Sequence, residues 1–126
     1  MEPPNTHILS TASPLDAIEI CYERGWTDGL PVVPPTPDRV AALLDFVGLD
    51  PKETLGVVPV RSRSLTAEKA AANSVMAGCL PEYFPIVLGV MRALFEHDPN
   101  CIHELSSVTN STGVLILVNG PIRKQI

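Results

Sequence analysis

The chain has 126 residues, of which 45% are hydrophobic and 18% are charged, and its formal net charge is −5. This composition is that of a folded chain of one domain or of part of a larger one, which excludes an intrinsically disordered protein. The acidic charge argues against binding to nucleic acid or to an anionic membrane surface. The longest apolar run, Val114–Val118, is far shorter than the roughly 20 residues that span a bilayer.

The first predicted element is a helix that follows a flexible leader of residues 1–12. Ser13 is typical of a helix cap and Pro14 of the first helical position, and Gly25 is typical of a helix end. We expect residues 13–126 to form a single α/β domain that is part of a larger fold or assembly.

A proline-rich segment over residues 28–36 separates this helix from the next one. Its prolines exclude a helix and a central strand, so the segment predicts a rigid extended connector. Apolar spacing predicts a second helix over residues 38–47. A β-branched stretch over residues 55–60 predicts a short strand, and its Gly56 and Pro59 favour a position at the edge of a sheet.

Two further helices are expected in the middle of the chain. Thr66 predicts the cap of a third helix that runs to about residue 77. Pro81 and Pro85 predict the first turn of a fourth helix, because a missing N–H matters least there. The polar residues 97–100 are expected to end it.

The run Val114–Val118 is continuously apolar, which is typical of a strand covered on both faces, as in a parallel sheet. The predicted fold is therefore α/β, with helices packed on a small, incomplete and mostly parallel sheet. Two strands cannot cover four helices. We therefore expect the missing strands to come from outside residues 1–126, from a larger fold or from a companion chain in a homo- or hetero-oligomer.

One candidate ligand site lies just beyond this predicted strand, where open α/β sheets bind their ligands. Asn119 offers donors and an acceptor, and Gly120 allows a ligand to approach the backbone; the alternative is an ordinary tight turn. In the preceding polar loop, His103 is a candidate general acid or base, and Thr109 and Asn110 are candidate ligand-binding residues. A solvated histidine is the structural alternative.

A second candidate site lies on and after the third predicted helix. Lys69 and Asn73 share one face at i, i+4 spacing, as ligand-binding residues or as an exposed polar stripe. Cys79 follows this helix and precedes the next one. A helix N-terminus can activate a thiol, so Cys79 is a candidate nucleophile, and the alternative is a small buried filler.

The histidines and cysteines do not predict a metal site. His97, Cys101, His103 and Glu104 are possible ligands, but their spacing matches no established zinc pattern. The three cysteines form no C-x-x-C motif, which favours reduced thiols in the cytoplasm over a disulfide framework. The sequence leaves the cofactor undetermined.

Three phrases, residues 28–36, 67–85 and 118–122, resemble a bacterial family associated with the UGSC selenoproteins, whose members are often labelled hypothetical or thioredoxin-like oxidoreductase. The resemblance runs from about Trp26 to the last residue. It implies an incomplete module here, because family members continue into another glycine-rich segment. His103 and Thr109-Asn110 fall where the family tends to have a histidine followed by a Thr-Asn or Thr-His pair.

Our leading hypothesis is a subunit or N-terminal portion of a small-molecule enzyme with a polar site at the end of strand 114–118. In it, His103 is the acid or base, Asn73, Asn110 and Asn119 orient the ligand, and Cys79 is a candidate nucleophile. The alternatives are a non-catalytic partner or scaffold subunit, whose polar motifs are only turns and caps, and a thiol-based redox protein. We expect a cytoplasmic chain without nucleic-acid or membrane partners.

Overall fold

The structure, a computed structural model, describes residues 9–58, 62–97, 102, 105 and 113–126. Its elements in chain order are α1 (Pro14–Glu23), α2 (Pro37–Val47), β1 (Thr54–Val58), β2 (Arg63–Thr66), α3 (Ala67–Met76), the 3-10 helix η2 (Pro81–Tyr83), α4 (Phe84–His97) and the 3-10 helix η3 (Pro121–Lys124). Among the described residues, no helix combines the length and the apolar character that crossing a membrane requires.

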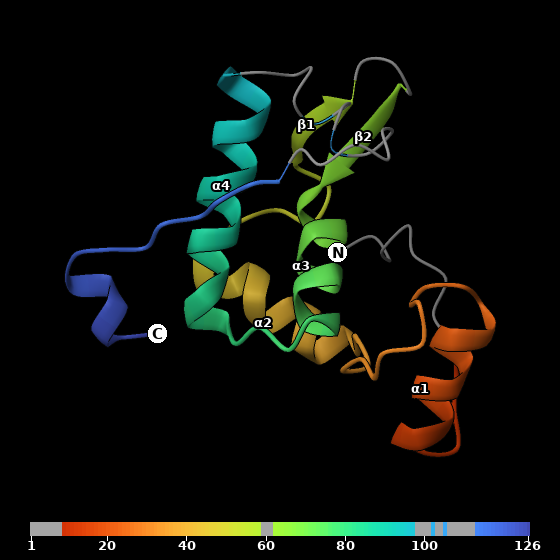
Figure 1. Ribbon diagram of the computed structural model, residues 1–126. Coiled ribbons are helices and arrows are strands. Elements are labelled where there is room, and N and C mark those ends of the chain that lie inside the picture. Colours follow the sequence, from red (N-terminus) through yellow and green to blue (C-terminus); the bar gives the residue numbers. More distant parts are fainter. Residues whose placement is uncertain (1–8, 59–61, 98–101, 103–104, 106–112) are drawn as a thin grey trace.

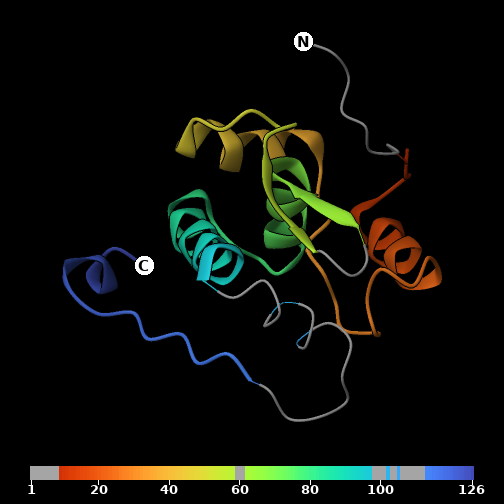
Figure 2. The ribbon, with the colours of Figure 1, turned by 90° about the horizontal axis from the view of Figure 1, so that it is seen from above.

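A packed body is formed by α2, α3, η2, α4 and the two strands, and it contains the core (Figures 1 and 2). Phe84, at the start of α4, is fully buried in it. The inner face of α3 is lined by small side chains, which let neighbouring helices approach closely. The buried core residues are Leu43, Leu44, Ala67, Ala70, Ala71, Val75, Phe84 and Leu88.

The sheet consists of β1 and β2 paired antiparallel, with an irregularity between Thr54 and Gly56. The α/β class is therefore confirmed at the level of mixed helices and strands. The described sheet is antiparallel, so the structure does not confirm a mostly parallel one. Of the strand predicted over residues 55–60, residues 55–58 are present in β1, and residues 59–60 lie outside the described residues. Strand β2 was not predicted because Arg63 and Ser64 lack the apolar alternation of a strand.

Three of the predicted helices begin as the sequence indicates. The Ser13 side chain accepts a hydrogen bond from the Asp16 amide (3.1 Å) at the start of α1, and the Thr66 side chain accepts one from Lys69 (3.4 Å) at the start of α3. Helix α2 begins at Pro37 and ends at Gly48, which has φ +68°. The fourth helix was predicted from Pro81, but residues 81–83 form η2 and α4 begins at Phe84.

The apolar segment 114–118 is not a strand in the structure, which corrects the sequence prediction. These residues run outside the packed body toward η3 (Figures 1 and 2), and none of them pairs with a described strand. Its five apolar side chains are exposed by 44, 82, 52, 79 and 39% in chain order. The exposed fractions alternate between lower and higher values along the segment. This alternation indicates an extended backbone, since successive side chains of an extended chain point to opposite sides. We call residues 113–126 the C-terminal arm.

Candidate functional site

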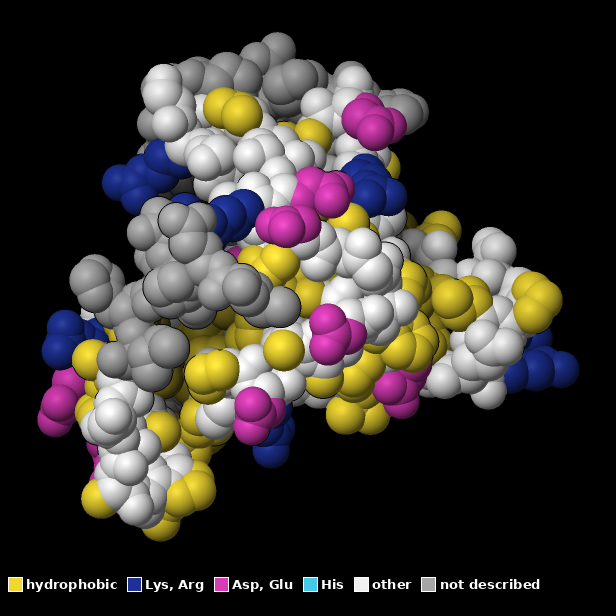
Figure 3. Space-filling view, turned by 180° about the vertical axis from the view of Figure 1, so that it is seen from behind, with side chains coloured by type: hydrophobic (Ala, Val, Ile, Leu, Met, Phe, Trp, Pro, Cys, Tyr) yellow, Lys and Arg dark blue, Asp and Glu magenta, His cyan; other side chains and the backbone are white. Residues whose placement is uncertain are grey.

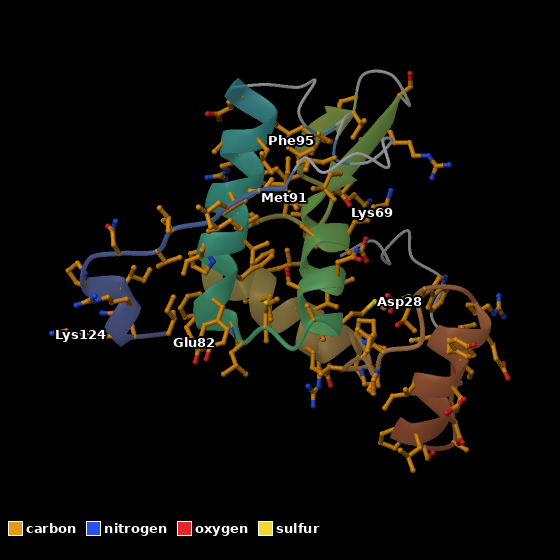
Figure 4. The ribbon with its side chains drawn as sticks, viewed as in Figure 1. Asp28, Lys69, Glu82, Met91, Phe95 and Lys124 are labelled. Carbon is orange, nitrogen blue, oxygen red and sulfur yellow. The ribbon has the colours of Figure 1, made fainter. Side chains whose placement is uncertain are left out.

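The first pair of predicted site residues, Lys69 and Asn73, lies on the exposed side of α3. The Asn73 side-chain amide donates a hydrogen bond to the Lys69 carbonyl oxygen of the preceding turn (2.8 Å). Lys69 points away from the body near the start of the helix (Figure 4). The two residues lie on one face of the helix, as expected. This face is exposed to solvent, and the Asn73 amide is bonded to the backbone of its own helix.

The buried side of α3 explains why Asn73 is outside. Ala70, Ala71 and Ser74 occupy the face that packs against the core. The buried Ser74 hydroxyl donates to the Ala70 carbonyl oxygen (2.8 Å), so this face places no unbonded side-chain donor against its neighbours. The helix orients its small residues inward and Asn73 toward solvent.

Cys79 lies beyond the other end of α3, in the junction that leads to η2. Gly78 turns the chain with φ +83°, and the Cys79 amide donates to the Ser74 carbonyl oxygen (2.9 Å). The Cys79 side chain is half-buried and lines a small hollow of about 100 Å³ together with Arg39 of α2. The other lining residues are Ala42, Leu43, Val75, Leu80 and Pro81.

Arg39 is the one charged side chain of this hollow. It is exposed, and its guanidinium makes no hydrogen bond or ion pair with the part of the chain that the structure describes. Lys69 and Cys79 are separated by the length of α3, so they do not belong to one hollow.

Asn119 and Gly120 lie in the C-terminal arm, immediately before η3. Both are exposed, and Gly120 has φ +86°, a conformation that favours glycine. Helix α4 lies between this turn and α3 in both ribbon views (Figures 1 and 2). The structure therefore does not bring the turn at Asn119 and Gly120 together with α3, which carries Asn73.

His103, Thr109 and Asn110 lie outside the described residues, as do Cys101 and Glu104. The roles predicted for His103, Thr109 and Asn110 stay predictions. Among the residues that are described, no group of three or more histidine, cysteine, aspartate or glutamate side chains could hold a metal ion.

A second hollow, which sequence reasoning did not predict, lies between α2 and α4. It has a volume of about 350 Å³, and Arg92 is its single charged lining residue. The other lining residues are Phe46, Val47, Leu49, Pro85, Leu88 and Gly89. We call this hollow the α2–α4 groove. One feature of the sequence could have indicated this groove. Phe46 is a large aromatic residue of α2 that lies beside, and not among, the buried residues of that helix.

Comparison of the chain with models of known protein families, with curated proteins and with solved structures finds no match. The surface of the described residues includes two hollows, each lined by one arginine, and an arm of exposed apolar residues.

Proposed function

We propose that this chain is a subunit or portion of a larger assembly, in which residues 114–118 become a strand covered by another polypeptide segment. The observation that carries the proposal is five consecutive large apolar side chains that are all 39 to 82% exposed. Soluble chains rarely expose a continuous apolar patch of this kind unless it is an interaction site. An extended apolar segment without a partner is also an aggregation hazard, which a partner would remove.

The size of the described sheet supports this proposal. A two-stranded sheet is marginal by itself, and most sheets have four to six strands. Val57 of β1 is 50% exposed, so the described sheet has an open face as well as few strands. Further strands from a partner would enlarge the sheet and cover the arm.

Of the roles weighed for such a subunit, a non-catalytic partner agrees best with the described geometry. Asn73 bonds its own helix, and α4 lies between α3 and the turn that precedes η3 (Figures 1 and 2). In this role the polar motifs serve as caps and turns, as Thr66 and Gly78 do.

The native mass of the purified protein, with an arm variant beside it, tests this function. Leu117 is 79% exposed, so Leu117→Glu should leave the packed body folded and shift the native mass toward that of the single chain. Leu9→Glu is the matched control, because Leu9 is exposed but lies outside the arm. A wild-type protein that has the mass of one chain at all concentrations would contradict the proposal.

The second candidate is a small-molecule enzyme subunit, favoured by the hollow that Cys79 shares with Arg39. In this candidate Cys79 is the nucleophile, His103 the acid or base, and Asn110 and Asn119 orient the ligand. Its first test is the rate at which iodoacetamide alkylates Cys79 at pH 7. We expect Cys79 of the folded chain to be alkylated faster than the same cysteine in an unstructured peptide, as its role as nucleophile requires. A rate no faster than that of the peptide would remove Cys79 from both the enzyme and the thiol-redox hypotheses.

A further inference from the structure

Residues 14–30, which we call the α1 lobe, stand apart from the packed body (Figure 1). Helix α1 makes at most marginal contact with the other described helices and strands. The lobe nevertheless carries four large hydrophobic side chains that are at least half exposed. They are Leu15 (74%), Tyr22 (58%), Trp26 (50%) and Leu30 (69%).

Helix α1 is amphipathic, and its charge has one sign. Leu15, Ile18 and Tyr22 follow one another at i, i+3 and i+7 and form an apolar stripe. Glu19 lies one turn after Leu15, along the edge of this stripe. Every charged residue of the helix is acidic, namely Asp16, Glu19 and Glu23.

The α2–α4 groove has the complementary character. Phe46, which lines it, is 58% exposed, and the remaining apolar lining comes from both helices. Arg92 is exposed at the groove, and its guanidinium makes no hydrogen bond or ion pair with the described residues. Hydrophobic side chains gather across the middle of the face on which α2 lies (Figure 3).

We infer that the α2–α4 groove receives the acidic helix α1 of a second copy of this chain. The apolar stripe with Leu15 and Tyr22 covers Phe46, and the carboxylate of Glu19 pairs with Arg92. Docking of an amphipathic helix into an apolar groove is a common mode of recognition between proteins. Two copies that exchange α1 reciprocally form a closed two-fold dimer, in which each groove and each helix is used once.

Charge selects α1 as the occupant over the other exposed apolar element. The C-terminal arm carries Arg123 and Lys124 and no acidic residue, so it would bring cations to Arg92. Helix α1 brings three carboxylates. Within one copy, α1 and α4 lie on opposite sides of α3 (Figures 1 and 2), so the helix that fills the groove comes from a second copy.

Charge reversal tests this pairing by sedimentation of the full chain over a range of concentrations. We expect Glu19→Lys and Arg92→Glu each to raise the dimer dissociation constant about tenfold, because repulsion replaces attraction at two symmetry-related sites. The double variant should restore most of the wild-type affinity. Arg63→Glu is the control for the change in net charge, since Arg63 is exposed on β2, away from the groove.

A cross-link gives a readout that does not depend on affinity. Leu15 is replaced by a photo-crosslinking amino acid, and light and heavy isotope copies of the chain are mixed. We expect cross-links between a light and a heavy copy that map to residues 46–49 or 85–92. Cross-links that map only within one copy, or charge variants without effect on the dimer, would overturn the inference.

This inference and the proposed function can fail separately. If Leu117→Glu lowers the native mass while the Glu19 and Arg92 variants do not, the arm is an interface and the α2–α4 groove is not. If the reverse holds, the α1 lobe is the interface and the function proposed for the arm is wrong.

Discussion

The packed body and the C-terminal arm contain the same kinds of apolar residue in opposite surroundings. In the body, Phe84 is fully buried and Leu88 is 5% exposed, whereas in the arm Leu115 is 82% exposed. In the body, the small side chains of α3 allow α2 and α4 to pack closely against it, and these helices enclose the buried residues. The arm has the hydrophobicity of a core strand without described neighbours. Apolar content therefore predicts which residues need burial, but it does not predict which segment buries them.

The largest expected difference between the two regions comes from deleting one large side chain in each. Phe84→Ala should lower the free energy of unfolding by about 3–5 kcal/mol, because it removes a ring that is fully enclosed by the core. Leu117→Ala should change the free energy of unfolding of the separate chain by less than about 0.5 kcal/mol. Urea unfolding of both variants measures this. A similar loss for both would mean that the arm packs on its own body.

Two glycines of the packed body differ in the space around them, and their substitution by alanine tests how tightly the body is packed. The ring of Phe95 lies against Gly56, so a methyl group there would collide with it, and Gly56→Ala should cost about 1–3 kcal/mol of stability. Gly89→Ala is the matched control, because open space surrounds Gly89 in α4. That change should stabilise the protein by about 0.5–1 kcal/mol through helix propensity.

The close approach of Phe95 to Gly56 can be verified by rescue. The double variant Gly56→Ala with Phe95→Leu should lose less stability than the sum of the single variants in urea unfolding. Additive losses would show that the glycine is needed for another reason.

Removing a helix cap should affect global unfolding differently in the packed body and in the α1 lobe. Thr66→Ala removes the cap of α3, which packs in the core, and should lower the free energy of unfolding by about 1 kcal/mol. Ser13→Ala removes the equivalent bond in α1. Because the lobe stands apart, this change should speed amide hydrogen exchange within residues 14–23 and leave global unfolding unchanged. A global loss from Ser13→Ala would show that α1 supports the body.

The smallest effect is expected at Asn73. Its amide bonds the carbonyl of its own helix at an exposed position, so Asn73→Ala should change the unfolding free energy by less than about 0.5 kcal/mol. Thermal unfolding of the wild type and the variant measures this change, and the same experiment with candidate small-molecule ligands shows whether Asn73 contributes to ligand binding. A ligand that stabilises the wild type but not the variant would favour the enzyme hypothesis over the partner role.

The helices could be predicted because their ends depend on local chemistry. Ser13 and Thr66 fulfil their expected roles as helix caps, since capping bonds involve only neighbouring residues. The break at residues 81–83 was missed for a related reason. Pro85 lacks the N–H that would bond the carbonyl of Pro81, so a regular α-helix cannot be continuous through that turn.

The sheet and the site depend on tertiary partners, which the sequence does not specify. Strand β2 is polar at Arg63 and Ser64 and exists because it pairs with β1. The predicted strand 114–118 has the right composition but no described strand beside it. Cys79 was predicted as a candidate nucleophile or a small buried filler, whereas the hollow that it shares with Arg39 depends on the packing of α2 against α3.

In the proposed assembly a partner covers residues 114–118, and amide hydrogen exchange of the purified wild-type protein measures this cover residue by residue. We expect slow exchange of these five amides at a native mass above that of one chain, and fast exchange once Leu117→Glu has released the arm. Exchange of these amides in the wild-type protein at the rate of an unstructured peptide would show that no partner covers them.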